Sequence, residues 1–191
     1  MKKALLLILI IAAMLVPVSA SSQYISISAS GGYTSTTDSA VIGAGMNYGY
    51  LSDVSRFVGI GFGTHMDFAF INSEYGGFEF GALAGASFEF RPAERTTITL
   101  VVGPGVTFQA DKENYVNFGI GADVSFSYYF GKDKNTGIVV GATVYPQFAS
   151  WGDEGRRPFD IIASGYVGVT FRFRGYSYNQ LEPDPLPFIL I

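Results

Sequence analysis

Apolar residues alternate with small or polar residues along most of the chain after Gln23. A period of two is the signature of β-strands, and no segment in this part of the chain keeps the period of a helix. The alternation divides into stretches that span residues 23–30, 40–50, 57–70, 77–90, 96–109, 115–130, 137–148 and 160–173. The pattern therefore predicts an all-β chain of eight antiparallel strands.

The two faces of these predicted strands differ in composition. One face is apolar or aromatic and carries no charge over about fifty positions, as expected beside hydrocarbon, where a charge at mid-bilayer costs about 2–4 kcal/mol. The other face collects glycines, serines, threonines and nearly all of the strand charges. Because small residues suit the narrow interior of an eight-stranded barrel, the pattern predicts an up-and-down transmembrane β-barrel.

A soluble barrel with the apolar face inside is the alternative. Its exterior would then be the glycine-rich face, which has few of the Lys and Glu residues that keep a protein soluble. An interior of eight strands also cannot hold so many Phe and Tyr side chains. Both arguments favour the membrane barrel.

The connections between the predicted strands alternate in character. Short charged turns at residues 51–56, 91–95 and 131–136 alternate with connections at 31–39, 71–76, 110–114 and 149–159, which include the two longest. Short periplasmic turns that alternate with longer outer loops are typical of outer-membrane barrels. An even number of strands then places both termini in the periplasm.

Aromatic residues and prolines add detail to this barrel. In the strand at 77–90, alanines lie between Phe80 and Phe88, which are separated by about 20 Å along the bilayer normal at ~3.3 Å per residue and a tilt of ~40°. This spacing predicts aromatic girdles at the two membrane interfaces. Pro104 and Pro146 each remove a ladder hydrogen bond, so we expect β-bulges near both.

The ends of the chain predict an export signal and a tail. Lys2 and Lys3 precede an apolar run, Pro17 and the small-residue ending Val18-Ser19-Ala20. This order predicts a secretory signal peptide at residues 1–20, although a membrane anchor is the alternative that a longer run would favour. Residues 21–173 then form the barrel, and residues 174–191, which contain three prolines, form a periplasmic tail.

Composition excludes several classes of protein. The chain has no cysteine, so it has neither a disulfide framework nor an acylated N-terminal cysteine. Without Lys2 and Lys3, ten basic residues face sixteen acidic ones, which is a formal charge of −6. An acidic chain without a basic stripe is a poor candidate for nucleic-acid binding. No metal-ligand spacing, phosphate loop or nucleotide motif is present, so we predict no metal and no cofactor.

The last predicted strand carries a recognisable pattern, Tyr166-x-Gly168-x-x-Phe171-x-Phe173. It resembles the C-terminal signal by which the bacterial assembly machinery recognises outer-membrane barrels. With eight strands and a signal peptide, the chain resembles the small OmpA, OmpX and OmpW type barrels. The resemblance implies Sec-dependent export, contact with outer-membrane lipids and passage through the assembly machinery. Members of this group commonly stop at the terminal aromatic residue, whereas this chain continues to Ile191.

The ionisable residues on the polar face are candidates for a charge network in the lumen. They are His65, Asp67, Glu79, Glu89, Asp123, Arg172 and Arg174. Buried charges are costly unless they are paired, so we expect a structural Glu89–Arg172 ion pair. In the outer connection at 149–159, Trp151, Arg156 and Arg157 are candidates for contacts with lipopolysaccharide phosphates or a surface ligand.

Catalysis would have to use the single histidine. His65 lies two residues from Asp67 on the same face, with Ser73 or Ser87 as a conceivable nucleophile. The surrounding HMDFAF segment does not match the local motif of eight-stranded lipid A deacylases, so we predict that the chain is not an enzyme.

Two functions remain after catalysis is set aside. A structural or surface-interaction role is the first prediction. The alternative is a narrow, OmpW-like pore for small or apolar solutes, because a glycine-rich lumen leaves space. A lumen blocked by Tyr129, Tyr145, Tyr166 and the arginines would count against the pore.

Overall fold

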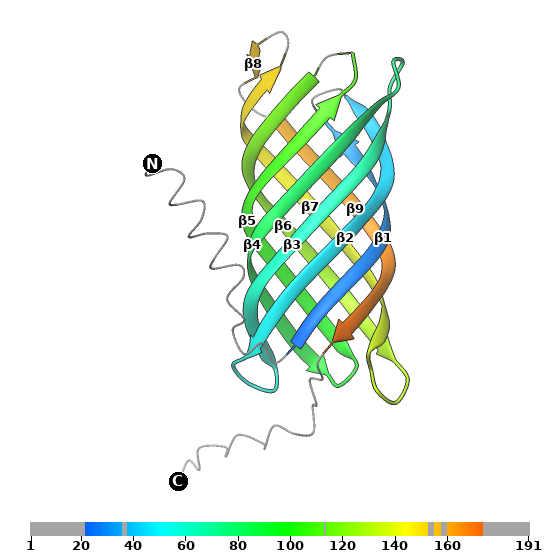
Figure 1. Ribbon diagram of the computed structural model, residues 1–191, viewed down its shortest axis with the longest axis vertical. Helices are drawn as coiled ribbons and strands as arrows, with labels where there is room; N and C mark the ends of the chain where they lie inside the picture. The colour runs from blue at the N-terminus through cyan, green and yellow to red at the C-terminus, as the bar shows by residue number, and fades with distance from the viewer. Residues whose placement is uncertain (1–21, 36–37, 113, 153–154, 158–159, 174–191) are drawn as a thin grey trace, which may run out of the picture.

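The computed structural model describes residues 22–35, 38–112, 114–152, 155–157 and 160–173 (Figure 1). Their strands are β1 (Ser22–Thr34), β2 (Ser39–Asp53), β3 (Val58–Asn72), β4 (Gly77–Ala93), β5 (Thr96–Ala110), β6 (Asn114–Phe130), β7 (Thr136–Gly152), β8 (Gly155–Arg157) and β9 (Asp160–Phe173). The described residues include no helix that is long and apolar enough to cross a membrane. All eight predicted strands are confirmed, and most extend further than the alternation indicated. The predicted signal peptide, Arg174 and the tail lie outside the described residues.

The eight long strands form one closed antiparallel barrel. They pair in the order β6-β5-β4-β3-β2-β1-β9-β7, and an additional β6–β7 pairing closes the sheet. The predicted fold class is therefore confirmed. The connection predicted at residues 149–159 is wrong in part: residues 149–152 belong to β7, and the ninth strand, β8, pairs with them. Ser150 pairs with Arg157, and Gly152 pairs with Gly155. Part of the predicted outer loop is thus a short hairpin.

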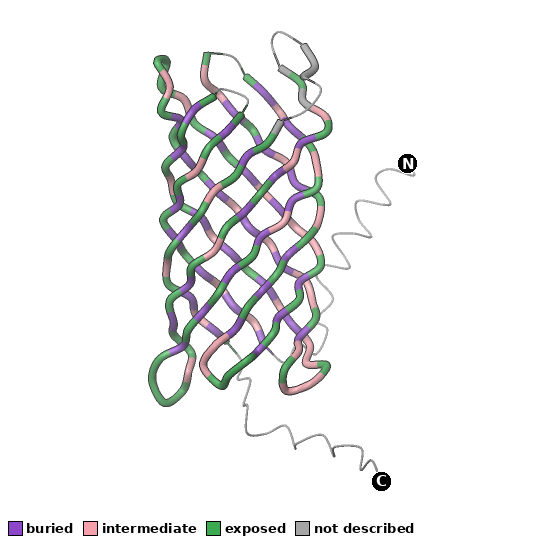
Figure 2. Tube along the Cα trace, turned by 180° about the vertical axis from the view of Figure 1, so that it is seen from behind, coloured by how far each residue is buried: buried purple, intermediate pink, exposed green. Residues whose placement is uncertain are grey.

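Burial follows the period of two predicted for the strands. Buried and exposed positions alternate along the barrel wall in Figure 2. None of the positions predicted to face lipid is buried, and Ile42 and Val167 expose 67% and 61% of their surface. The soluble alternative is therefore wrong, because it requires these apolar residues to point inward. The outward apolar wall matches the hydrocarbon layer of a bilayer.

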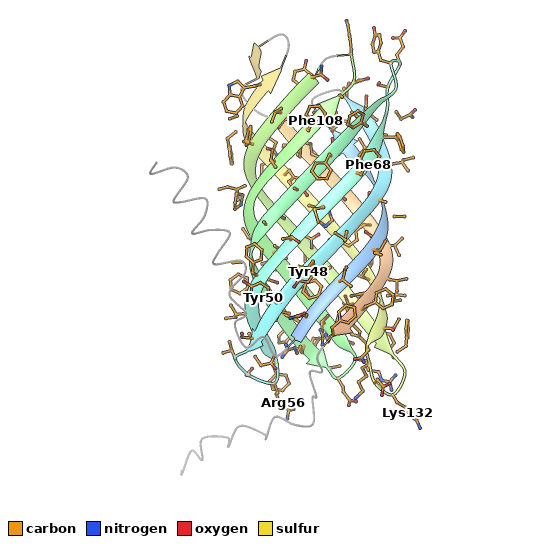
Figure 3. The ribbon with its side chains drawn as sticks, viewed as in Figure 1. Tyr48, Tyr50, Arg56, Phe68, Phe108 and Lys132 are labelled. Atoms are coloured by element: carbon orange, nitrogen blue, oxygen red, sulfur yellow. The ribbon has the colours of Figure 1, made fainter. Side chains whose placement is uncertain are left out.

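Aromatic side chains gather near both ends of this wall. We call the end with Ser22 and Phe173 the termini end and the opposite end the β8 end. Tyr48 and Tyr50 lie toward the termini end, and Phe68 and Phe108 lie toward the β8 end (Figure 3). Phe78 lies between the last two, with ring centroids 6.0 Å from Phe68 and 5.8 Å from Phe108. The four labelled aromatic residues thus lie toward the two ends of the wall, as expected for two aromatic girdles.

The two prolines have different effects on the sheet. Near Pro146, the β6–β7 register shifts between Phe118 and Gly119, which leaves Phe148 as an extra residue, so the predicted bulge is confirmed. At Pro104 the predicted bulge is wrong, because the register of β5 continues unchanged on both sides. Pro104 has no N–H to donate, and β4 and β5 have no bridge pairs between Leu83–Gly105 and Ala86–Val102. No extra residue is inserted at this point of the ladder. Its register shift lies between Phe90 and Ala93 instead.

Candidate functional site

An ion network closes the lumen near the termini end. Glu89 Oε2 lies 2.7 Å from Arg172 Nη2, which confirms the predicted pair. Glu89 Oε1 also accepts a hydrogen bond from Arg91 Nε at 2.6 Å. Arg91 Nη2 lies 2.5 Å from Asp53 Oδ1. Two arginines and two carboxylates thus balance each other in a region where an uncompensated charge would be expensive.

Arg91 and Asp53 were missed because both were assigned to short turns. The strands β2 and β4 extend to Asp53 and Ala93, so the alternation that places Glu89 in the lumen places Arg91 there too. Arg91 has no exposed surface. The guanidinium of Arg172 lies 4.5 Å from the ring centroid of Tyr129, a favourable cation–π contact. The signal that could have found Arg91 is its spacing of two from Glu89.

A second polar cluster surrounds His65 at the middle of the lumen. His65 Nε2 lies 2.5 Å from Asp67 Oδ2, and Nδ1 contacts Asn47 Oδ1. Both ring nitrogens thus contact side-chain oxygens in the lumen. The imidazole is fully buried. The predicted proximity of His65 and Asp67 is therefore a direct contact.

Asp123 connects this histidine to the opposite wall. Its Oδ1 accepts hydrogen bonds from Tyr166 Oη and Thr143 Oγ1, both at 2.8 Å, and lies 3.5 Å from His65 Nδ1. Asn47 Nδ2 donates to Tyr166 Oη at 2.8 Å. The cluster therefore links β2, β3, β6, β7 and β9 across the lumen, which suits a structural role.

The geometry around His65 does not reproduce the considered catalytic arrangement. Ser73 lies in the β3–β4 connection, where its hydroxyl donates to Asp111 at 2.6 Å, and Ser87 is buried in the wall. Within the described residues, the hydroxyl within hydrogen-bond distance of His65 is that of Thr143, at 3.2 Å from Nε2. No group of three or more His, Asp or Glu side chains suited to a metal ion occurs in the described part of the chain.

A third cluster lies toward the β8 end. Gln109 Nε2 donates to Glu79 Oε2 at 2.6 Å and to Thr34 Oγ1 at 2.5 Å. Asn117 Nδ2 donates to Thr107 at 3.1 Å and to Gln109 at 3.3 Å. The predicted lumen charges thus fall into separate clusters instead of one continuous network, and Glu79 accepts a hydrogen bond from a neutral amide, that of Gln109.

The lumen glycines make room for tyrosine rings. A Cβ atom added to Gly49 would lie 2.5 Å from the ring of Tyr24, its partner across the β1–β2 ladder. Gly141 faces Tyr166 in the same way across β7 and β9. A Cβ on Gly105 would lie 2.9 Å from the ring of Tyr145, which is itself buried. At these positions the expected empty space is filled by aromatic side chains.

The contact between Gly49 and Tyr24 predicts a clear difference between two alanine substitutions. Gly49→Ala is expected to destabilise the barrel by about 1–3 kcal/mol, because the new methyl group overpacks the lumen. Gly165→Ala is the control, since its Cβ would face lipid and lie 3.8 Å from its nearest neighbour. Urea unfolding of both variants in lipid vesicles measures the difference. Equal stability of the two variants would show that the Tyr24 ring moves aside at little cost.

The remaining candidate residues lie in the wall and at the β8 end. Tyr166 and Gly168 of the predicted assembly signal belong to β9; Tyr166 is buried in the lumen, while Phe173 is 52% exposed on the lipid-facing side beyond Phe171. Trp151 is also exposed, and its ring centroid lies 5.3 Å from that of Phe118. Arg156 and Arg157 form part of β8, but their side chains lie outside the described structure.

Comparisons with known proteins identify the fold. No family model and no curated protein matches the sequence. Among solved structures, the chain is similar to Ail, the attachment invasion locus protein of Yersinia pestis, with a TM-score of 0.54, 12% identity and coverage of 81% of this chain and 99% of that one. This chain has the fold of small eight-stranded outer-membrane barrels.

Two further structures show how widely this fold is used. OprG, an outer-membrane protein of Pseudomonas aeruginosa, matches with a TM-score of 0.57 and 7% identity over 82% of this chain and 97% of its own. The outer-membrane enzyme PagL matches with a TM-score of 0.53 and 15% identity over 76% and 98%. Identities this low establish the fold, whereas function depends on the residues grafted onto it.

Proposed function

We propose that the protein is a sealed outer-membrane barrel with a structural and surface-presenting role and without catalysis. The packing of the lumen carries this proposal. Arg91, His65 and Gln109, which belong to the three polar clusters, each have 0% exposed surface. A side chain beside a water-filled channel would keep accessible surface, so these values support a closed lumen at all three levels.

The tyrosines strengthen the argument against a pore. Tyr129, Tyr145 and Tyr166 are all buried, and Tyr145 packs with Leu83, Val101 and Ile162 in an apolar cluster. The lumen is therefore blocked by this apolar cluster as well as by the ion network of Glu89, Arg91 and Arg172 near the termini end. Ions crossing such a lumen would lose their hydration without gaining matching ligands.

The β8 end supports the surface-presenting part of the proposal. The β7–β8 hairpin extends the barrel wall there, and Trp151 exposes 51% of its surface. We infer that the termini end faces the periplasm and the β8 end faces outward, because short turns join the strands at the termini end, as in outer-membrane barrels. Ail, whose name describes an attachment protein, has the same fold, which is compatible with a role in contacts at the cell surface.

Single-channel recording tests the sealed lumen directly. Residues 21–191, refolded and inserted into a planar bilayer, are expected to show no discrete conductance steps. The Tyr145→Ala/Tyr166→Ala variant is the positive control, because it removes the rings that pack beside Gly105 and Gly141 and is expected to produce openings. A heat-dependent gel shift confirms that both proteins are folded. Reproducible openings of the unmodified chain would overturn the proposal and favour the pore.

A further inference from the structure

The connections at the two ends of the barrel differ in charge. At the termini end, each of the three turns between strands carries at least one cation, and together these cations form what we call the basic rim: Arg56, Arg95, Lys132 and Lys134. At the β8 end, Asp38, Glu74 and Asp111 accompany Lys112 in the described connections, and the short strand β8 carries Arg156 and Arg157. The net charge of the whole chain is negative, so it does not reveal this difference between the two ends.

Ion pairs already occupy two of the carboxylates near the basic rim. Asp53 pairs with Arg91 inside the lumen, and Glu94 pairs with Lys134 across two turns. Within the described part of the chain, Arg95 and Lys132 have no ion-pair partner. Asp133 is the further carboxylate of these turns. Arg95 and Lys132 are therefore the rim cations that remain available for an external anion.

The basic rim lies at the depth of lipid headgroups. Tyr48 and Tyr50 mark the aromatic girdle toward this end, and Arg56 and Lys132 lie beyond it (Figure 3). Phe130, which is 44% exposed on the lipid-facing wall, precedes Lys132 by two residues. Since aromatic girdles mark the boundary between hydrocarbon and headgroups, cations just beyond the girdle face the phosphate layer.

The turn between β6 and β7 provides a concave surface in this layer. Residues 130–136 line an open crevice of about 260 Å³ that includes Lys132 and Lys134. Gly131 and Lys134 have φ angles of 72° and 51°, and these left-handed residues fold the turn back on itself. Phe130, which is exposed on the outer wall of the barrel, also lines this crevice. The crevice thus offers an apolar side to an acyl chain and the ammonium group of Lys132 to a phosphate, while Lys134 pairs with Glu94 and Asp133 also lines the crevice.

We propose that the basic rim binds the phosphate groups of anionic glycerophospholipids, with the β6–β7 crevice at its centre. Arg56 adds a second contact region, because its guanidinium lies 4.4 Å from the ring centroid of the exposed Phe57. A cation near an anionic membrane surface strengthens binding about fivefold, which corresponds to roughly 1 kcal/mol. The site would hold the termini end in the inner leaflet. The inference rests on the proposed membrane insertion but not on whether the lumen conducts.

Lipid retention measured by native mass spectrometry tests the proposal. Residues 21–191 are refolded in phosphatidylcholine bilayers that contain phosphatidylglycerol, extracted in mild detergent, and titrated with phosphatidylglycerol. We expect Lys132→Gln to weaken its binding about fivefold and Arg95→Gln/Lys132→Gln about 25-fold. Lys112→Gln at the β8 end is the matched control and should bind as the unmodified chain does.

Three outcomes would overturn this assignment. The first is unchanged affinity of the Arg95→Gln/Lys132→Gln variant, and the second is an equal loss in Lys112→Gln, which would indicate a nonspecific charge effect. The third is equally tight binding of soluble glycerophosphate, since acyl chains beside Phe130 would then contribute nothing. Conductance of the same preparations is recorded separately, so an open lumen would contradict the sealed barrel without affecting the lipid site.

Discussion

Replacing Glu89 with alanine is expected to destabilise the folded barrel by about 3–5 kcal/mol, because it breaks a buried ion pair by removing one partner. Glu89 bonds to both Arg91 and Arg172, at 2.6 and 2.7 Å. Without it, the two buried guanidinium groups would lose the carboxylate that they share. Urea unfolding of the refolded protein, followed by the fluorescence of its only tryptophan, Trp151, measures this loss.

Glu94→Ala is the matched control for the loss of a carboxylate. Glu94 pairs with Lys134 at the partly exposed termini end, where an ion pair contributes about 0–1 kcal/mol. A Glu89→Ala barrel as stable as Glu94→Ala would mean that water reaches Arg91 and Arg172. The packed-lumen argument would then fail at the termini end. The gel shift on heating provides a second readout of folding for both variants.

Ala84→Arg is expected to destabilise the barrel by about 2–4 kcal/mol, because Ala84 lies on the lipid-facing side of β4 midway between Phe80 and Phe88. That position corresponds to the centre of the hydrocarbon layer if the aromatic girdles mark its boundaries. An arginine there must stretch toward the interface or carry water into the bilayer, and either response costs free energy. Unfolding in phosphatidylcholine vesicles measures the change.

The same substitution near the end of the same strand is the control. Ala93 is exposed and lies beyond Phe90, so Ala93→Arg should cost about 0–1 kcal/mol, as at a membrane interface. The difference between the two variants reports depth in the bilayer, because strand, residue type and added charge are the same. Equal costs for the two would contradict the assigned position of the membrane.

The predicted Glu89–Arg172 pair shows that a local sequence pattern can predict a contact between strands that are not neighbours in the sheet. Glu89 and Arg172 belong to β4 and β9, which are not neighbours in the sheet. Their contact was predictable because both point into a narrow lumen, both lie near the termini end, and opposite charges in a barrel interior pair. Arg91 was not predicted, because the predicted strand ended at Phe90, whereas β4 continues to Ala93.

The glycines show where this reasoning stops. Their position on the lumen face follows from the period of two, but a glycine can mark either an empty space or a close contact. Gly49 and Tyr24 are direct partners across a ladder, and so are Gly141 and Tyr166. This pairing depends on register, which a one-residue shift would change entirely.

The sequence by itself determined the barrel, its strand order and which face meets lipid, because each of these follows from the alternation of side chains and the cost of charge in hydrocarbon. It also placed His65, Asp67, Asp123 and Glu79 in the lumen. Only the tertiary structure decided which of them meet, that Arg91 and Asp53 join the ion network, and that tyrosines fill the space beside the glycines. The physical reason is that contacts across a closed lumen join strands distant in the chain, and their partners depend on register and ring orientation.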